Sequence, residues 1–265
     1  MAIIMSIINQ KGGVGKTTTA EALARGLAEL HNKKVLCVDM DAQGNISYSL
    51  QARETGIANV WDVLREPHKI ETALQEVAPN ITLIASTPLL ANADMELTGN
   101  GRQAKLKEAL QRVADSYDYI IIDTPPALGI LTVNALVASS QCVITSQADI
   151  FSMRGISMLY TTITTIKQYI NPALQIAGIL LTRFNPRTSL SKAVLEQMNL
   201  SAQSIGTKLF NTFIRECNAI KEAQATRESI FSYAPKSNAS YDYQQFIWEV
   251  IPQPEHKLQA KPKLK

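Results

Sequence analysis

The sequence predicts an α/β fold in which a doubly wound, mostly parallel β-sheet is flanked by helices. Short apolar runs recur along the chain, as expected for strands that are buried on both faces of a parallel sheet. The stretches between them have helical periodicity and reach the length of about a dozen residues that a crossover connection requires. A chain of 265 residues with 46% hydrophobic content can bury one sizeable core. The alternation of the two patterns therefore favours helices on both faces of one sheet.

The six apolar runs are interpreted as buried strands over residues 3–8, 35–38, 81–85, 119–122, 142–145 and 176–181. Amphipathic stretches between them carry apolar residues at helical spacing. They predict crossover helices over residues 17–30, 103–116, 155–169 and 191–202.

Residues 1–251 are predicted to form a single domain, because no repeat and no Ser/Gly-rich linker divides them. Residues 252–265 are expected to be a disordered basic tail, since prolines interrupt a lysine-rich stretch with few apolar residues. This tail contains Lys257, Lys261, Lys263 and Lys265 against Glu255, which accounts for the whole net charge of +3. Any surface that binds nucleic acid on the neutral body must therefore be local.

The composition excludes several classes of protein. Cys37, Cys142 and Cys217 are widely spaced and the chain has only three histidines, so neither a disulfide framework nor a zinc site is indicated. The chain shows no secretion signal and no apolar run of about 18 residues, the length that a membrane span needs. We therefore expect a cytoplasmic protein with no membrane partner.

A glycine-rich segment lies directly between the first predicted strand and the first predicted helix. Residues 10–18 read QKGGVGKTT, in the context in which a P-loop binds phosphate. Its glycines allow a tight turn with inward N–H groups, Lys16 can reach the β- and γ-phosphates, and the Thr17 hydroxyl can bind magnesium. The predicted nucleotide-binding segment comprises Lys11, Gly12, Gly13, Val14, Gly15, Lys16, Thr17 and Thr18.

The segment departs from the standard G-x-x-x-x-G-K-[ST] pattern, because Gln10 occupies the position of the first glycine and Lys11 precedes the later ones. This is the deviant form of the Walker A motif. The alternative interpretation is a glycine-rich turn that binds no nucleotide, which the flanking strand and helix disfavour.

Three aspartates follow two of the predicted strands. Asp39 and Asp41 end the strand that begins at residue 35, and Asp123 ends the strand that begins at residue 119. Ligands of parallel sheets bind at the carboxyl ends of strands, and hard oxygen ligands suit a hydrated magnesium ion. Each aspartate alone could be a helix cap, but their combination with the glycine-rich loop favours a Mg-nucleotide site.

The segments KGGVGKTTTA, VDMDAQGN and YIIIDTPPALG resemble the Walker A, A′ and B segments of the ParA/MinD group of deviant Walker ATPases. Among these, the ParA partition ATPases are the most similar. The stretches GILLTRFNPRTS and IRECNAIKEAQATRESIFSYAPKSNASYDY extend the resemblance through most of the body. It implies a P-loop ATPase fold, ATP and Mg²⁺ as cofactors, and slow, partner-stimulated hydrolysis of ATP to ADP and phosphate.

The resemblance also implies roles for individual residues. Lys11 would cross the interface of an ATP-bound homodimer to reach the partner's phosphates, Lys16 would bind phosphate, and Asp41 would position the attacking water. These three residues are the predicted catalytic set. The predicted magnesium site comprises Thr17, Asp39 and Asp123, and the predicted adenine contacts are Thr182, Arg183, Phe213 and Arg215.

The resembled family binds DNA without sequence preference in its ATP state, and a ParB-like centromere-binding protein triggers release. The resemblance thus implies association with the nucleoid and a row of basic residues on one face. The candidates are Arg187, Lys192, Arg215, Lys221, Arg227 and Lys236, with Lys257 to Lys265 as an auxiliary arm. Each candidate could instead be a solvated surface charge.

Other functions share the nucleotide motifs. A MinD-like ATPase that positions membrane or protein cargo would need a C-terminal amphipathic helix, whereas the tail has no apolar face and contains Pro262. A biosynthetic enzyme or reductase of the same superfamily would need a substrate pocket or cluster-binding cysteines. A non-hydrolysing scaffold would lack a catalytic group, but Lys16, Asp41 and Asp123 are all present.

Overall fold

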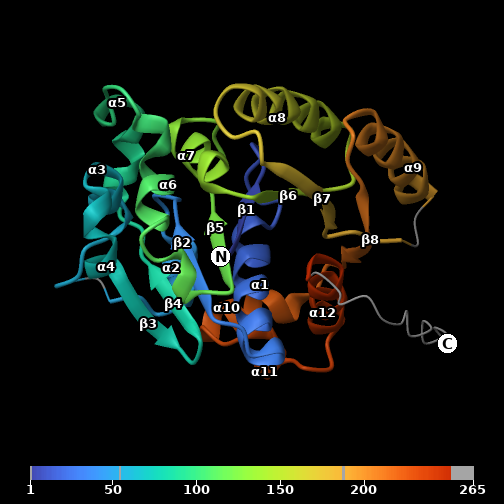
Figure 1. Cartoon of the computed structure of the whole chain (residues 1–265). Helices are drawn as coiled ribbons and strands as arrows, with labels where there is room; N and C mark the ends of the chain where they lie inside the picture. The colour runs from blue at the N-terminus through green and yellow to red at the C-terminus, as the bar shows by residue number, and fades with distance from the viewer. Residues whose placement is uncertain (1, 54, 187–188, 252–265) are drawn as a thin grey trace.

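The computed structural model describes residues 2–53, 55–186 and 189–251. Its centre is an eight-stranded sheet in the order β3-β4-β2-β5-β1-β6-β7-β8, flanked by helices on both faces (Figure 1). The predicted doubly wound fold is confirmed. The strands are β1 (Ile3–Ile8), β2 (Val35–Asp39), β3 (Leu74–Ala78), β4 (Ile81–Ile84), β5 (Tyr119–Asp123), β6 (Gln141–Ser146), β7 (Gln175–Thr182) and β8 (Leu209–Ile214).

All six predicted strands are present, and the pairings among them are parallel. The sequence did not predict β3, which pairs antiparallel with β4, or β8, which pairs parallel with β7. Both are edge strands that mix buried and exposed residues, so neither forms the continuous apolar run of a central strand.

Twelve α-helices occur in the described residues. They are α1 (Lys16–His31), α2 (Asn45–Ser49), α3 (Val60–Arg65), α4 (Ile70–Ala73), α5 (Ala93–Glu96), α6 (Lys105–Leu110), α7 (Ile130–Ala138), α8 (Ile150–Tyr169), α9 (Ser189–Ser204), α10 (Asn218–Thr226), α11 (Ile230–Tyr233) and α12 (Asn238–Val250). Four short 3₁₀ helices cover Pro67–Lys69, Pro88–Asn92, Arg102–Ala104 and Ala114–Ser116.

Three of the four predicted crossover helices correspond to α1, α8 and α9. The prediction of one continuous helix over 103–116 is wrong, because only α6 is α-helical there, between two 3₁₀ turns. Backbone bonds from Arg112 to Ala109 and from Val113 to Leu110 tighten the chain beyond α6. This tightening keeps Val113 and Ala114 buried just before β5 begins.

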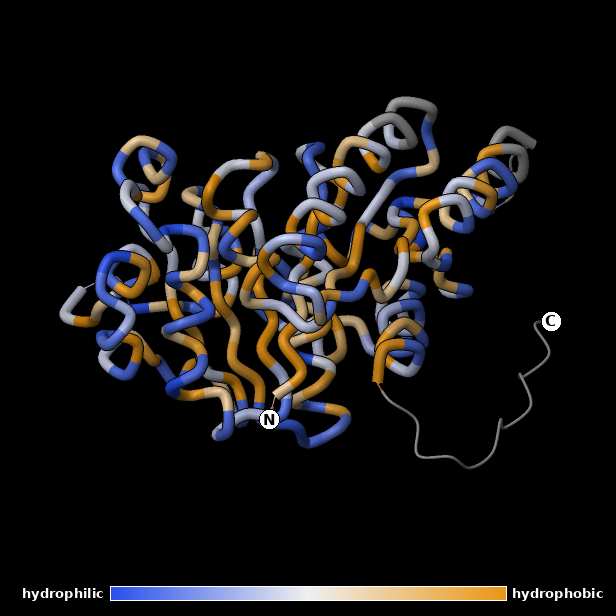
Figure 2. Tube along the Cα trace, turned by 45° about the horizontal axis from the view of Figure 1, so that its top comes forward, coloured by the Kyte–Doolittle hydropathy of each residue, from blue (hydrophilic) through white to orange (hydrophobic). Residues whose placement is uncertain are grey.

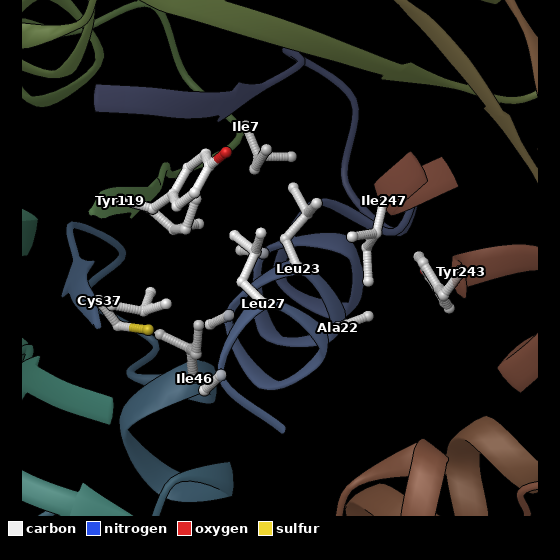
Figure 3. Close-up of a cluster of buried hydrophobic side chains, with 14 of the residues drawn as sticks. Ile7, Ala22, Leu23, Leu27, Cys37, Ile46, Tyr119, Tyr243 and Ile247 are labelled. Atoms are coloured by element: carbon white, nitrogen blue, oxygen red, sulfur yellow. The ribbon is translucent and has the colours of Figure 1, made fainter. Parts of the chain in front are cut away.

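The core lies on both faces of the sheet. One cluster of buried side chains joins the sheet to α1, α2, α10, α11 and α12, and two others join it to α3 to α9. Figure 2 shows the central strands as largely hydrophobic. Figure 3 shows the first cluster around α1, where Leu23 and Leu27 point toward Ile7 of β1 and Tyr119 of β5.

Gly26 brings two helices of this cluster into close contact. A Cβ atom at this position would lie 2.1 Å from Cδ1 of Ile247 in α12. The absent side chain therefore allows α1 and α12 to approach each other.

No helix of the described part is long and apolar enough to cross a membrane.

Candidate nucleotide site

A cavity of about 380 Å³ opens at the carboxyl ends of the parallel strands, beside the loop between β1 and α1. This is the edge at which doubly wound sheets bind ligands. Its walls come from segments that are far apart in the sequence: the glycine-rich loop, the loops after β2, β5, β7 and β8, and α10. The lining residues are Gly12, Gly13, Gly15, Lys16, Thr17, Thr18, Asp41, Gln43, Asn45, Pro126, Thr182, Arg183, Ile214, Arg215, Glu216, Cys217, Ile220, Lys221, Gln224 and Tyr243.

The glycine-rich loop has the backbone shape of a phosphate-binding turn. Gly13 and Gly15 have φ angles of 72° and 79°, a left-handed conformation that disfavours other residues. The N–H of Thr19 donates to the Gly15 carbonyl at 2.9 Å, which begins α1. The positive end of a 16-residue helix therefore faces the cavity. Val14, a residue of the loop, is fully buried and does not line the cavity.

Lys16 is the positively charged side chain at the centre of the site. It is only 6% exposed, and its Nζ donates to the Lys11 carbonyl oxygen at 3.2 Å. Burial lowers the pKa of Lys16, whereas the charges of Asp123 and Asp41 act in the opposite direction. A phosphate group in the cavity would add the negative charge that favours the ammonium form.

Asp123 is fully buried at the end of β5, and neither of its carboxylate oxygens accepts a hydrogen bond of normal geometry from the described residues. Burial raises the pKa of Asp123 well above its ordinary value, and the neighbouring charge of Asp39 adds to the effect. The Thr17 hydroxyl and the Lys16 ammonium oppose it. A buried carboxylate whose oxygens are not fully engaged within the chain fits a hydrated magnesium ion, because it leaves acceptors for the metal's water ligands.

Asp39 is also fully buried, but its carboxylate oxygens accept several hydrogen bonds within the chain. Its carboxylate accepts hydrogen bonds from the Asp41 N–H at 3.1 Å and from the N–H and hydroxyl of Ser47 at 2.9 and 2.6 Å. Burial raises the pKa of Asp39 to about 6, and the Ser47 hydrogen bonds counteract the rise. Asp39 does not line the cavity, so the structure places it behind the residues that do.

Asp41 lies in the loop after β2 and does line the cavity. One carboxylate oxygen accepts from the Gln43 N–H at 3.0 Å. Asp41 is 8% exposed and interacts electrostatically with Lys16. The structure thus brings together Lys16, Asp41 and Asp123, three of the residues that the sequence singled out.

The side chain of Lys11 forms an ion pair with a residue of the same chain. Its Nζ lies 2.9 Å from Oδ2 of Asp149, which caps the N-terminus of α8. The Lys11 backbone N–H donates to the Asn9 side chain at 2.9 Å, while its own side chain is 43% exposed. An exposed ion pair of this kind contributes little stability and can be exchanged for another anion.

The comparisons with known proteins agree with this geometry. A family model described as an AAA domain matches residues 2–176. The sporulation initiation inhibitor protein Soj of Bacillus subtilis is 37% identical over 253 residues, which cover 94% of this chain and 98% of Soj. The chromosome partitioning protein ParA of Myxococcus xanthus is 36% identical over 243 residues, which cover 91% of this chain and 84% of that protein. The chain belongs to the ParA family of partition ATPases.

A solved structure with a bound nucleotide is similar to this chain over most of its length. Cobyrinic acid a,c-diamide synthase from Mycobacterium smegmatis, with a bound ATP analogue and magnesium, is 30% identical, with a TM-score of 0.80 and 93% of each chain covered. Its ligands agree with the ATP and Mg²⁺ predicted from the sequence. Its different activity illustrates that this fold serves more than one function.

The predicted adenine contacts of this ParA-family ATPase do not all reach the cavity. Thr182 and Arg183 line it, and the Thr182 hydroxyl lies 2.9 Å from the Val14 carbonyl of the glycine-rich loop. Arg215 also lines it, while its guanidinium forms a two-pronged ion pair with Asp242 at 2.6 and 2.9 Å. Phe213 instead packs edge-on against Phe184, with ring centroids 4.8 Å apart, and does not line the cavity.

The predicted DNA contacts lie on several elements. Arg187 and residues 257–265 lie outside the described residues, as does the side chain of Lys192 in α9. Lys221 in α10 and Lys236 before α12 are exposed. Arg227 stacks over the Tyr48 ring at 3.9 Å from its centroid. Arg215 and Arg227 are therefore engaged by neighbours within the chain, whereas Lys236 faces solvent and Lys221 is exposed beside the cavity that it lines.

Sequence reasoning missed the contribution of α10 to the site. Gln224 lines the cavity and donates from its side-chain amide to the Thr18 hydroxyl at 3.2 Å. Ile220 and Cys217 line the same wall. Nothing in the local sequence places α10 against a loop some 200 positions earlier, because long-range packing leaves no local periodicity.

Proposed function

We propose that this ParA-family protein hydrolyses ATP with magnesium, dimerises when ATP is bound, and binds DNA without sequence preference until a partner stimulates hydrolysis. The observation that carries the proposal is that Lys16 and Asp41 line the cavity beside the glycine-rich loop, while the buried Asp123 interacts electrostatically with Lys16. Phosphoryl transfer depends mainly on positioning and on charge stabilisation, which these groups provide.

Each group has a separate proposed role. The N–H groups of the glycine-rich loop and the Lys16 ammonium hold the phosphates. Thr17 and Asp123 would hold magnesium, with Asp39 in a supporting position, and the ion when bound neutralises phosphate charge. Asp41 orients the attacking water at the cavity wall. Thr182 and Arg183 line the part of the cavity that is proposed to receive the base.

Lys11 is proposed to connect hydrolysis with dimerisation. Its exposed ammonium can leave Asp149 and reach a phosphate of a partner protomer, where a charge delivered in trans would stabilise the transition state. ATP would then be required for dimerisation, and hydrolysis would weaken the dimer.

The proposed cargo is DNA of a chromosome or plasmid. Relatives over nearly the whole length are named for sporulation control and chromosome partitioning, which supports a cytoplasmic, nucleoid-associated role with a ParB-like partner. Residues 1–251 would act as one ATPase domain, and the basic residues 257–265 would add phosphate contacts.

The test of the proposed chemistry is ATP turnover by the full chain and two variants. Lys16→Ala should lower turnover by about 100-fold or more, because it removes the buried charge that holds the phosphates. Asp41→Ala should lower turnover to a similar degree while ATP binding persists. Wild-type turnover by Lys16→Ala would contradict the assignment of the phosphate site, and normal turnover by Asp41→Ala would require another residue to position water.

A further inference from the structure

We propose that Ser47 and Ser86 are positioning residues for ATP hydrolysis, because their hydroxyls fix the loop that carries Asp41. The inference rests on the proposed function, since it presupposes that Asp41 orients the attacking water. Neither serine lines the cavity, so each would act through Asp41 rather than on the nucleotide.

The evidence is a closed ring of hydrogen bonds behind the cavity wall. The Ser47 hydroxyl donates to Asp39 at 2.6 Å and accepts from the Ser86 N–H at 2.9 Å. The Ser86 hydroxyl donates to the Asp41 carbonyl oxygen. The Asp41 N–H donates to the other carboxylate oxygen of Asp39 at 3.1 Å, which completes the ring.

The ring joins three elements that converge at this edge of the sheet. Asp39 ends β2, Ser47 lies in α2, and Ser86 follows β4, which pairs with β2 in parallel register. Both peptide groups that flank the Asp41 side chain are held, its N–H by Asp39 and its carbonyl by Ser86 and by the Gly44 N–H. The serines thereby restrain the backbone from which the carboxylate projects.

Burial makes these hydrogen bonds effective. Asp39 is fully buried and Ser47 is 8% exposed, so water competes little with the bonds between them. The Asp41 carboxylate itself accepts only the Gln43 N–H in the described structure, so its placement depends on the backbone beneath it. A shift of about 1 Å at a catalytic group can lower the rate by as much as 100-fold.

The helix that carries Ser47 also provides a matched control. Ser49 is a buried serine of α2 whose hydroxyl donates to Glu21 at 2.6 Å, outside the ring. Ser49→Ala removes a comparable hydrogen bond from the same helix without touching Asp39, Asp41 or Ser86. It therefore separates loss of stability from loss of positioning.

The experiment measures kcat and KM for ATP with the full chain, together with Tm and equilibrium ATP affinity. Ser47→Ala and Ser86→Ala should each lower kcat by about tenfold or more, with KM and ATP affinity within about twofold of wild type. The kcat of the double variant should fall no further than that of the more impaired single variant, because both serines belong to one ring. Ser47→Thr, which keeps the hydroxyl, should recover most of the kcat, and Ser49→Ala should retain it.

Several outcomes would overturn the inference. One is a wild-type kcat in either serine variant. Another is a kcat loss in the double variant equal to the product of the two single losses. The third is a kcat loss in Ser49→Ala as large as that in Ser47→Ala. Asp41→Ala belongs in the same series. Normal turnover by Asp41→Ala would refute the proposed role of Asp41 itself, whereas an inactive Asp41→Ala beside active serine variants would refute only the positioning role of the serines.

Discussion

Asp39 and Asp123 end neighbouring strands and are both fully buried, yet their surroundings assign them different tasks. Donors from Asp41 and Ser47 occupy the carboxylate of Asp39, whereas the Asp123 oxygens accept no hydrogen bond of normal geometry from the described residues, although the Thr17 hydroxyl lies close by. The sequence predicted both as parts of a metal site from their position after strands. Position after a strand does not separate them, because hydrogen-bond partners from other segments decide what a buried carboxylate does. The family resemblance nevertheless implies a supporting role for Asp39 and a water-mediated magnesium contact for Asp123.

This contrast predicts that replacing the two aspartates with asparagine has opposite effects on thermal stability. In magnesium-free protein at pH 7.5, Asp123→Asn should raise Tm by about 2–4 °C, since it removes a buried charge whose desolvation Thr17 and Lys16 only partly offset, at a gain of about 1 kcal/mol. Asp39→Asn should lower Tm, because its new amide would point a donor at groups that already donate. Thermal unfolding of the two variants beside wild type measures both effects.

The pH dependence of the Asp123→Asn gain follows from the raised pKa. A carboxyl whose folded pKa lies above its unfolded value of about 3.9 binds its proton more tightly when folded. This tighter binding of the proton stabilises the folded state in full at pH values below the unfolded pKa. The stabilisation is lost as the pH rises through the folded pKa. The gain should therefore be largest at high pH and vanish near pH 4. A gain that is constant with pH, or a loss at pH 7.5, would contradict this account of Asp123.

At the scale of elements, the contact between α1 and α12 depends on Gly26. Helical periodicity predicted α1 well, but the requirement for glycine at this position became visible only when Ile247 was placed beside it. Neither α10 nor α12 was predicted. α10 buries only Ala223, so its position depends on tertiary packing. α12 carries buried apolar residues at helical spacing, at Ala239, Tyr243, Phe246 and Ile247, so its periodic pattern is present in the sequence.

Gly26→Ala should lower the free energy of unfolding by about 1 kcal/mol or more, because overpacking outweighs the gain in helix propensity. Ile247→Val removes the Cδ1 atom that the new Cβ would meet. The double variant should be more stable than the sum of the two single effects predicts. Denaturant unfolding of the four proteins gives the coupling energy, and strict additivity would show that this contact does not limit the approach of the helices.

At the scale of the whole molecule, the sequence predicted the six inner strands of the sheet, the phosphate loop and the aspartates, because each depends on a local pattern. The rest of the site could not be predicted from local patterns. The cavity combines the glycine-rich loop with α10, and Arg215 and Arg227 are engaged by Asp242 and Tyr48. A basic residue in a sequence therefore does not reveal whether it is available to a phosphate backbone.

The most direct test of the central claim is binding of the full chain to an arbitrary DNA duplex with ATP, with ADP and without nucleotide. Fluorescence anisotropy at two salt concentrations would measure it, with Lys11→Ala as the control that binds ATP but should not form the dimer. We predict binding that requires ATP, ignores the duplex sequence, weakens at higher salt and is lost in Lys11→Ala. Equal binding in all three nucleotide states, or none in any state, would contradict the proposal of an ATP-controlled DNA partition switch.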